Sequence, residues 1–457
     1  MTGVERAGSG VAAELLEASS RYIDEGIFEG AASVSPIDGR VGDFGGGVAL
    51  VLSFSHVIAV EGGGGLALVD TSSPSLAPRA RTALRTWSDA PVRTIIYTHG
   101  HVDHVGGARL FSDEAADAGE ARPRVVAHEA VDDRFSRYDL THGYNALINA
   151  RQFGRRAALG VGQGDWPTEW VRPDTTFSAR MTLRLGGEVV ELRHARGETD
   201  DHAWLWMPDR RIICGGDFLT WVFPNAGNPQ KVQRYPGEWA LALREMASLH
   251  PELFLPAHGL PISGAERVAR VLDDIATALE SLVTQTVALM NAGARLDDVV
   301  REVRVPAELA DRPYLRATYD EPEFVVRNIW RLYGGWWDGD PAHLKPAGAA
   351  ELAAELADLV GGAGRLASRA TDLAAAGDHR LACHLAELAT QAAPASAECQ
   401  AARAEVYRAR RDGEVSLMAR GIFGAAAEAS APGSTGGPTG GPTDEPALPA
   451  GPKGEGD

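Results

Sequence analysis

Short apolar runs, separated by glycine-rich or polar turns, occupy the chain from about residue 48 onward. The first three runs cover residues 48–54, 56–60 and 66–70. Their β-branched composition and turn spacing are typical of strands in a meander. Residues 74–90 then show helical periodicity, and a fourth apolar run ends at Ile96. This alternation of strands and helices, which continues to about residue 265, predicts a layered α/β domain.

The apolar period changes to 3.6 residues after Glu266, and a mainly helical domain is expected from there. Its later part, residues 347–412, is rich in alanine. The final residues are rich in glycine and proline and cannot form a core. The predicted parts are an N-terminal extension at residues 1–24, an α/β domain at 25–265, a helical domain at 266–415 and a disordered tail at 416–457.

Two segments do not follow this alternation. A helix is expected over residues 11–22, which could pack on the first domain or on a partner subunit. Residues 129–175 carry many polar and aromatic side chains with little periodicity. That pattern favours an inserted loop over a site rather than part of a core.

The composition is that of a globular protein, because 44% of the 457 residues are hydrophobic and 23% are charged. The formal net charge of −18 argues against nucleic acid and anionic membranes as partners, since their phosphates would be repelled. The three cysteines have no CxxC spacing, which favours a reducing compartment. The sequence shows no 18-residue apolar stretch and no signal peptide, so we expect a cytoplasmic protein without a membrane span.

Metal-ligand side chains gather where the fourth apolar run ends. His99, His101, Asp103 and His104 lie within six residues, and three nearby glycines leave the backbone room to turn them inward. The alternative is a polar strand end whose histidines only form hydrogen bonds. For four such residues together, a metal site is the better interpretation.

Three later apolar runs also end in a metal-ligand side chain, namely Glu198, Asp217 and His258. Two cations a few ångströms apart need about six to eight protein donors, and these seven residues supply that number. The expected arrangement is His99, His101 and Glu198 on one metal, Asp103, His104 and His258 on the second, and Asp217 as the bridge. Two divalent ions would lower the pKa of a shared water towards neutrality, so a hydrolytic site for an anionic or polarised ester is expected.

The remaining histidines of these strands carry weaker signals. His56 lies inside an apolar run and is interpreted as a hydrogen-bonded core residue. His202 begins an apolar strand four residues after Glu198, where it could support the site or simply belong to the core. Nothing in the sequence distinguishes His194 from a hydrogen-bonded strand residue.

The segment Thr98-His-Gly-His-Val-Asp-His104 resembles the HxHxDH signature of the metallo-β-lactamase superfamily. Most members have Gly-His-Thr where this sequence has Gly197-Glu198-Thr199, and the glutamate is similar to that of the alkylsulfatase branch. The helical block from Trp330 to Pro341 resembles the same branch, whose second domain mediates dimerisation. The resemblance covers roughly residues 25–415.

This resemblance implies an αββα sandwich as a catalytic domain at residues 25–265 and an all-α dimerisation domain at residues 266–415. It implies a homodimer and a hydrolase that cleaves alkyl sulfate esters with a metal-activated water. The expected cofactor is a pair of divalent metal ions, with zinc as the expected metal. Asp103 or Asp217 would orient the nucleophilic water.

The sequence departs from the alkylsulfatase branch at three places. A Gly/Pro-rich tail stands where the branch has a sterol-carrier-like domain, and His202 and Asp217 stand in place of an acidic residue and a glutamate. Where the family binds sulfate, the available side chains are Asn225, Asn228, Lys231 and Arg234. Their loose match leaves a lactone, thioester or phosphate ester open as the small-molecule substrate. A metal-containing binding or scaffold protein is the alternative from another functional class.

Overall fold

The computed structural model describes residues 8–153 and 166–431 and divides into two compact units. The first unit runs to Pro346 and also includes Glu414–Ile422. Among the described residues, the second unit consists of Ala347–Gly413 and residues 423–431. All the candidate site residues belong to the first unit.

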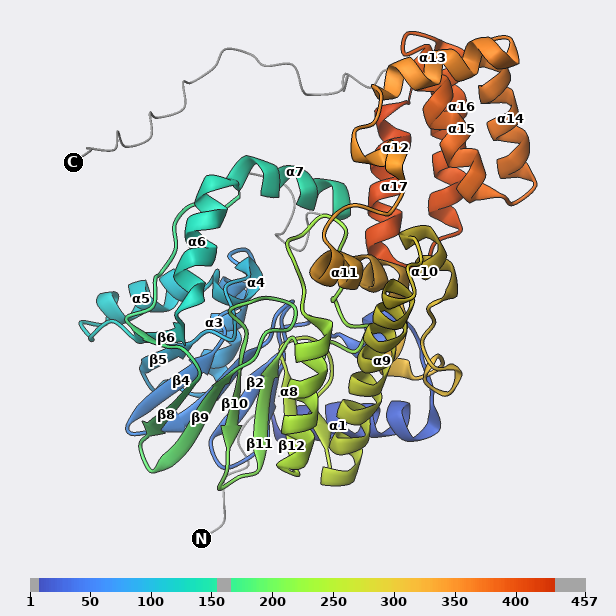
Figure 1. Ribbon diagram of the computed structural model, residues 1–457. Helices are drawn as coiled ribbons and strands as arrows, with labels where there is room; N and C mark the ends of the chain where they lie inside the picture. Colours follow the sequence, from blue (N-terminus) through green and yellow to red (C-terminus); the bar gives the residue numbers. More distant parts are fainter. Residues whose placement is uncertain (1–7, 154–165, 432–457) are drawn as a thin grey trace, which may run out of the picture. The chain divides into compact units, whose positions relative to one another are not determined.

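Two β-sheets form the centre of the first unit (Figure 1). The seven-stranded sheet has the order β1 (Val41–Asp43), β2 (Val48–Val51), β3 (Val57–Gly62), β4 (Gly65–Val69), β5 (Val92–Ile96), β6 (Arg124–His128) and β7 (Thr175–Phe177). The six-stranded sheet has the order β13 (Ile262–Ser263), β12 (Leu253–Pro256), β11 (Ile212–Gly216), β10 (Ala203–Met207), β9 (Glu188–His194) and β8 (Arg180–Leu185). Strands β1 to β4 are antiparallel neighbours, which confirms the predicted meander, whereas β4 to β7 and the pair β11–β12 are parallel.

Helices flank the sheets and continue the chain after them. Those of the first unit are α1 (Ser9–Glu25), α2 (Ala31–Val34), α3 (Ala77–Trp87), α4 (Val102–Val105), α5 (Ala108–Asp117), α6 (Ala130–Leu140), α7 (His142–Phe153), α8 (Pro236–Ser248), α9 (Ala265–Asn291), α10 (Leu296–Glu302), α11 (Pro322–Gly334) and α12 (Pro341–Leu344). The second unit contains α13 (Ala349–Val360), α14 (Ala363–Ala375), α15 (His379–Ala392) and α16 (Ala397–Asp412). Helix α17 (Leu417–Ala429) is divided between the two units.

Successive residues of the first sheet face two different hydrophobic cores, as the two-residue period of a strand requires. In β3, Val57 and Ala59 face the core that includes side chains of α3, α5 and α6. Ile58 and Val60 face the core that includes the second sheet, α8 and α9. The order of layers is therefore helices, sheet, sheet, helices, which confirms the expected αββα sandwich followed by helices.

The expectation of an inserted loop over residues 129–175 is wrong for residues 130–153, which form α6 and α7. The buried face of α6 consists of Val131, Arg134, Phe135 and Tyr138. An arginine within this face interrupts the apolar period, so the helix was not recognisable from hydrophobicity alone. Residues 154–165, which the same expectation covered, lie outside the described residues.

The compact units do not divide at residue 265, where the sequence predicted the end of the α/β domain. Helix α9 starts there and buries Val268, Leu272 and Leu279 in the same core as the second sheet. It packs along α8, as Figure 1 shows. An apolar stripe reveals that a helix is buried, but not which element covers it. Helix α1 enters this core through Leu15 and Tyr22, so the expected N-terminal extension packs on the first unit.

The expected tail from residue 416 includes a helix, because residues 417–429 form α17. Ser416 Oγ donates a hydrogen bond to the carbonyl oxygen of Tyr319 at 2.7 Å, which anchors the start of this helix. This helix has no proline and two glycines, so its composition differs from that of the Gly/Pro-rich residues that follow it. Residues 432–457 lie outside the described residues. Within the described ranges, no helix is both long and apolar enough to cross a bilayer.

Candidate metal centre

All seven candidate ligands follow the ends of strands, and these strands come from both sheets. They are His99, His101, Asp103 and His104 after β5, Glu198 after β9, Asp217 after β11 and His258 after β12. The turn after β5 is tight, because a Cβ atom on Gly107 would lie only 2.1 Å from the carbonyl oxygen of Thr71. Glycine is therefore required there, as the sequence suggested. The structure brings the seven side chains together at one edge of the sandwich.

Nitrogen and carboxylate oxygen atoms of these side chains face one another at short range. The distances are 3.6 Å for His101 Nδ1 and Glu198 Oε1, 3.8 Å for His99 Nε2 and Asp217 Oδ2, 3.4 Å for His104 Nε2 and Asp217 Oδ1, 3.3 Å for His258 Nε2 and Asp103 Oδ2, and 3.5 Å for His258 Nε2 and Asp217 Oδ1. Three groups among the described residues could each hold a metal ion: His99–His104–Asp217, Asp103–His104–His258 and His101–Glu198–Asp217. Asp217 belongs to two of these groups, as a bridging carboxylate would.

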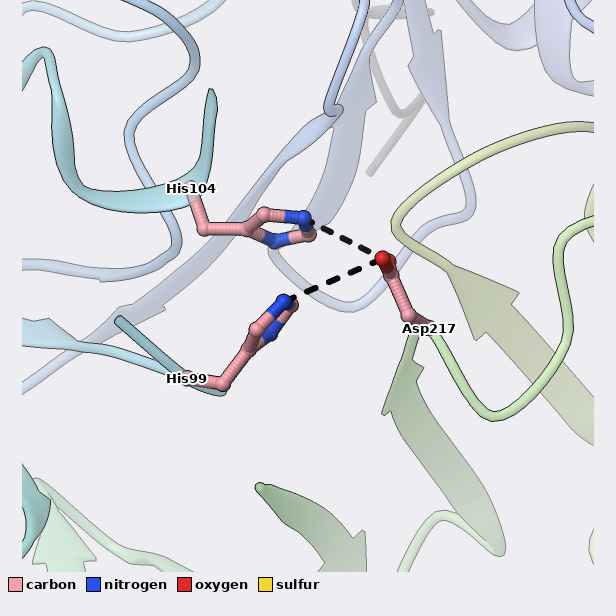
Figure 2. Close-up of side chains that lie close together, drawn as sticks. All are labelled: His99, His104 and Asp217. Atoms are coloured by element: carbon pink, nitrogen blue, oxygen red, sulfur yellow. Dashed lines mark ion pairs between the residues drawn. The ribbon is translucent and has the colours of Figure 1, made fainter. Parts of the chain in front are cut away.

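Two buried atoms of the cluster have no hydrogen-bond partner among the described residues. They are His104 Nε2 and Asp217 Oδ1, which lie 3.4 Å apart. Figure 2 shows the rings of His99 and His104 directed at the Asp217 carboxylate. Buried polar atoms without a partner are destabilising, and a divalent cation between an imidazole nitrogen and a carboxylate oxygen would satisfy both. The donor set therefore fits a divalent metal.

Burial and mutual charge shift the pKa values of the cluster in opposite directions. Burial lowers the pKa of His99 and of His101 well below the ordinary histidine value. Burial alone would also lower the pKa of His104, but the surrounding carboxylates, Asp217 first, raise it well above that value. Burial would raise the pKa of Asp217, yet His104 and His258 hold it well below the ordinary value. The carboxylates thus favour positive charge between His104 and Asp217, at the place that suits a divalent cation.

Burial raises the pKa of Glu198 to about 8, against the lowering influence of Arg234. The guanidinium of Arg234 is 3.4 Å from Glu198 Oε1 and also bonds the Glu198 backbone carbonyl. Asn225 Nδ2 donates to Glu198 Oε1 at 2.5 Å. Two of the four residues predicted to bind substrate therefore contact the candidate ligand Glu198 in this structure.

The other two residues predicted to bind substrate have different partners. Asn228 lies beside Gln152 of α7, with 3.4 Å between Nδ2 and the Gln152 Oε1 acceptor. Lys231 Nζ donates to Asn149 Oδ1, also on α7, at 3.1 Å. Burial lowers the pKa of Lys231 to about 7, with a further contribution from Arg234. Lys231 is thus the predicted substrate residue whose charge can change near neutral pH.

Asp70, at the end of β4, is a functional residue that the sequence reasoning missed. Its Oδ2 accepts hydrogen bonds from His104 Nδ1 at 2.7 Å and from Thr98 Oγ1 at 2.8 Å, and its Oδ1 accepts from the Thr98 amide at 2.8 Å. The bond from His104 assigns the proton to Nδ1 and leaves Nε2 for a metal. A signal was present, because Asp70 ends an apolar run just as Asp217 does.

His202 and His194 lie behind the cluster. His202 Nε2 accepts the backbone N–H of Asp217 at 3.2 Å, so His202 supports a candidate ligand rather than acting as one. His194 stacks on His128 with 3.7 Å between ring centroids, and its Nε2 bonds the carbonyl oxygen of Asp200. Cys214 is buried, in accord with the expected core position.

His56 is a fully buried core residue that anchors the loop after β12. Its Nδ1 accepts the N–H of Ser53 at 3.1 Å, so its Nε2–H donates to the carbonyl oxygen of Gly259, at 2.9 Å. Gly259 directly follows His258. The interpretation of His56 as a hydrogen-bonded core histidine is confirmed.

Acid should destabilise the protein through His56. Burial lowers its pKa to about 4, whereas an unfolded histidine has a pKa of about 6.5. The unfolded state therefore binds the proton first. The contribution of neutral His56 is complete above pH ~6.5 and is lost as the pH falls towards ~4, by at most about 3 kcal/mol. Urea unfolding between pH 7 and pH 4 should show the loss, with a shallower slope for His56→Asn; equal slopes would contradict this assignment.

Comparison with known proteins finds two families along the chain. Residues 50–258 match the metallo-beta-lactamase superfamily, and residues 295–433 match the family described as alkyl sulfatase dimerisation. A linear primary-alkylsulfatase of Pseudomonas sp. is 31% identical over 342 residues, which cover 71% of this chain and 64% of the relative. An (R)-specific secondary-alkylsulfatase of Pseudomonas sp. is 26% identical, covering 77% of this chain and 56% of the relative.

One solved structure and one further relative add to this picture. The structure of a stereoselective inverting sec-alkylsulfatase of Pseudomonas sp. matches with a TM-score of 0.75 at 22% identity, covering 86% of this chain and 65% of that one. The 2,4-dinitroanisole O-demethylase subunit alpha of Nocardioides sp. is 26% identical, covering 68% of this chain and 82% of the relative.

The chain spans less than two thirds of the length of the two alkylsulfatases that it resembles in sequence. Within that span it combines both matched families in the order that the sequence predicted, and its fold is that of the solved sec-alkylsulfatase. The chain therefore carries a metallo-β-lactamase domain followed by an alkyl sulfatase dimerisation domain, and its relatives in sequence include alkylsulfatases.

Proposed function

We propose that this protein is a metal-dependent hydrolase that cleaves alkyl sulfate esters with an activated water. The observation that carries the proposal is the convergence of seven metal-ligand side chains, with Glu198 only 3.6 Å from His101. A relative at 31% identity is named a linear primary-alkylsulfatase, which supports the sulfate ester as substrate.

The proposed cofactor is a pair of zinc ions. His99, His101 and Glu198 would hold one ion, Asp103, His104 and His258 the second, and Asp217 would contact both. Divalent ions in such a site act as Lewis acids that polarise water and ester oxygens near neutral pH. In this proposal Asp217 or Asp103 accepts a hydrogen bond from the attacking water and fixes its direction.

The segment with Asn225, Asn228, Lys231 and Arg234 is the proposed anion-binding side of the site. Arg234 and Asn225 contact Glu198, so their first role in this proposal is to hold that carboxylate. Lys231 carries the charge that is left to face a sulfate group. Its Nζ donates a hydrogen bond to Asn149 of α7, so the ammonium lies beside that helix.

Sulfate release from alkyl sulfates of several chain lengths tests the proposal directly. Purified protein should release sulfate, lose activity on exhaustive chelation and regain it with Zn²⁺. Activity that survives complete removal of metal would refute the proposed site. A parallel panel of lactones, thioesters and phosphate esters tests the other ester classes, and a preference for one of them would displace the sulfate ester as substrate.

The charge of Lys231 predicts a pH-dependent KM. Below pH ~7 its ammonium is charged and attracts an anionic substrate; above that pH the charge is lost. We expect KM for an alkyl sulfate to rise about 10-fold between pH 6 and pH 8, the effect of losing a charged hydrogen bond of roughly 1.5–3 kcal/mol. Lys231→Arg keeps its charge and should show a flat KM, and Lys231→Met should show a high KM throughout. The same rise in Lys231→Arg would exclude Lys231 as its cause.

A methyl aryl ether is the second candidate substrate. The relative named 2,4-dinitroanisole O-demethylase subunit alpha is matched over 82% of its own length, a larger share than for either alkylsulfatase. Hydrolysis of such an ether would release methanol and a phenolate. Incubation with 2,4-dinitroanisole and measurement of the coloured phenolate test this candidate. The rate of phenolate release, compared with the rate of sulfate release from an alkyl sulfate, decides between the ether and the sulfate ester as substrate.

We also propose a homodimer, in which residues 266–415 supply the dimerisation domain, and a cytoplasmic location. The match of residues 295–433 to the alkyl sulfatase dimerisation family supports the dimer. Sedimentation equilibrium should give about twice the mass of 48.4 kDa for one chain. A single-chain mass over the micromolar range would contradict it.

A further inference from the structure

A buried arginine on α6 contacts the loop that carries Glu198. Arg134 is 2% exposed, and its Nε donates to Oδ2 of the fully buried Asp201 at 2.8 Å. Its terminal nitrogen bonds the carboxylate of Asp200, which is partly exposed. Both aspartates lie between β9 and β10, two and three residues after Glu198. Arg134 therefore reaches one of the four loops that carry candidate ligands.

Asp201 extends this contact to the loop after β5, which carries His99 and His101. The oxygen that accepts from Arg134 also accepts the backbone N–H of Gly100 at 2.9 Å. Gly100 lies between His99 and His101, so a continuous set of hydrogen bonds runs from α6 to the peptide that joins two candidate ligands. The amide of Ala203 donates to the carbonyl oxygen of Thr98 at 2.7 Å and joins the same two loops a second time.

The packing around Gly100 is close. A Cβ atom at this position would lie 2.8 Å from Cδ of Arg134 and 3.0 Å from Oδ2 of Asp201. Ordinary contacts at a Cβ are longer, so a glycine is needed to let the arginine approach. The absence of a side chain at Gly100 thus allows the backbone between the two histidines to lie against both Arg134 and Asp201.

The positive charge of the buried Arg134 is balanced by the carboxylates of Asp200 and Asp201. A guanidinium without partners would be strongly destabilised in the interior, and here it faces two carboxylates. Burial alone would raise the pKa of Asp201, but Arg134 and the Gly100 amide hold it below the ordinary aspartate value. The planar guanidinium bonds two carboxylates at once, in fixed directions that a lysine ammonium does not provide.

We propose that Arg134 is a positioning residue of the metal centre: through Asp201 it fixes the Gly100 peptide and so holds His99 and His101 in the arrangement that binds an ion. This inference rests on the proposed metal-dependent function. It concerns residues outside the ligand set, and it assigns α6 a role beyond covering the first sheet.

Metal affinity of the folded protein is the test. Zn²⁺ would be titrated into metal-free protein in competition with a chromophoric chelator, and the Co²⁺ form would be followed by its visible absorption. Arg134→Met is expected to weaken the affinity for at least one ion by about 10- to 100-fold, as losing the support of a ligand does. Its Co²⁺ bands should change, because His99 and His101 change their geometry. Arg134→Lys should recover part of the affinity.

The matched control is Arg172→Met. Arg172 also forms an ion pair with α6, through Asp132 at 3.0 Å, but its side chain is 46% exposed. Loss of that pair should leave the metal affinity and the Co²⁺ spectrum unchanged. The double variant Arg134→Met/Asp201→Asn should bind metal no more weakly than the weaker of the two single variants, since both act through one set of bonds.

Several outcomes would overturn the inference. One is an Arg134→Met protein with native circular dichroism, a metal Kd within about twofold of wild type and an unchanged Co²⁺ spectrum. If Arg134→Met does not fold, wild-type affinity in both Arg134→Lys and Asp201→Asn overturns it equally. Additive losses in the double variant exclude the path through Asp201. If the wild-type protein binds neither Zn²⁺ nor Co²⁺, the proposed function fails first and this inference falls with it.

Discussion

Replacing Asp217 by asparagine should reduce alkyl sulfate hydrolysis by about three orders of magnitude or more. Asp217 belongs to two of the three groups that could hold a metal, and its carboxylate lies within 3.8 Å of three histidines. Asparagine keeps the size but removes the charge that a shared position between two cations needs. A loss of about 4 kcal/mol of transition-state stabilisation, a modest value for a metal site, corresponds to a roughly 1,000-fold lower rate.

The measurement is kcat/KM for an alkyl sulfate, together with the metal content of each purified variant. Asp209→Asn is the matched control, because Asp209 is an exposed aspartate in the turn at the opposite end of β11. It should keep wild-type activity and metal content. An Asp217→Asn protein that retains both ions and loses less than tenfold in kcat/KM would argue against a bridging role.

Replacing Asp70 by alanine should lower the free energy of unfolding by about 3–5 kcal/mol, the cost of breaking a buried ion pair. The variant leaves the donors of Thr98 and the Nδ1–H of His104 without their acceptor, and all three side chains are buried. Alanine is also poorly suited to the φ of 60° at this position. His104 is then free to turn its Nε2 away, so metal affinity should fall about 10- to 100-fold.

Urea unfolding and zinc competition measure the two effects of Asp70→Ala. Asp70→Asn retains one acceptor oxygen and tolerates the positive φ better, so its losses should be smaller in both measurements. Asp133→Ala, at an exposed position of α6, should change neither quantity by more than about 0.5 kcal/mol. Asp70→Ala with wild-type stability and affinity would mean that His104 is held by other contacts.

The seven candidate ligands could be selected from the sequence because each of them follows an apolar strand. A strand is recognised from its local pattern, and the ends of neighbouring strands meet at one edge of a sheet. Glu198, Asp217 and His258 are far apart in the chain, yet the structure brings them to within hydrogen-bonding or ligand range of the cluster after β5. The resemblance to the superfamily and its branch rested on the HxHxDH motif, on Glu198 and on the helical block from Trp330 to Pro341.

The supporting residues were harder to predict. Asp70 had the same signal as Asp217, a carboxylate at a strand end, but its role depends on which side chain faces it. Arg134 gave the opposite signal, because a charged residue in an apolar period suggests solvent exposure or a loop. Only its burial against Asp200 and Asp201 shows that the charge is neutralised.

The sequence by itself determined a layered α/β domain, most of its strands and the set of candidate side chains, since these follow from local periodicity and from residue type. The αββα order of layers was implied by the family resemblance. The tertiary structure decided which segments contact one another. Arg234 and Asn225 contact Glu198, and His202 supports Asp217. Helix α9 belongs to the core of the sandwich, and Arg134 joins two loops. The physical reason is that hydrogen bonds and ion pairs depend on distances between segments that are remote in the chain. No local pattern records those distances, so they become known only when the two sheets and their loops are packed together.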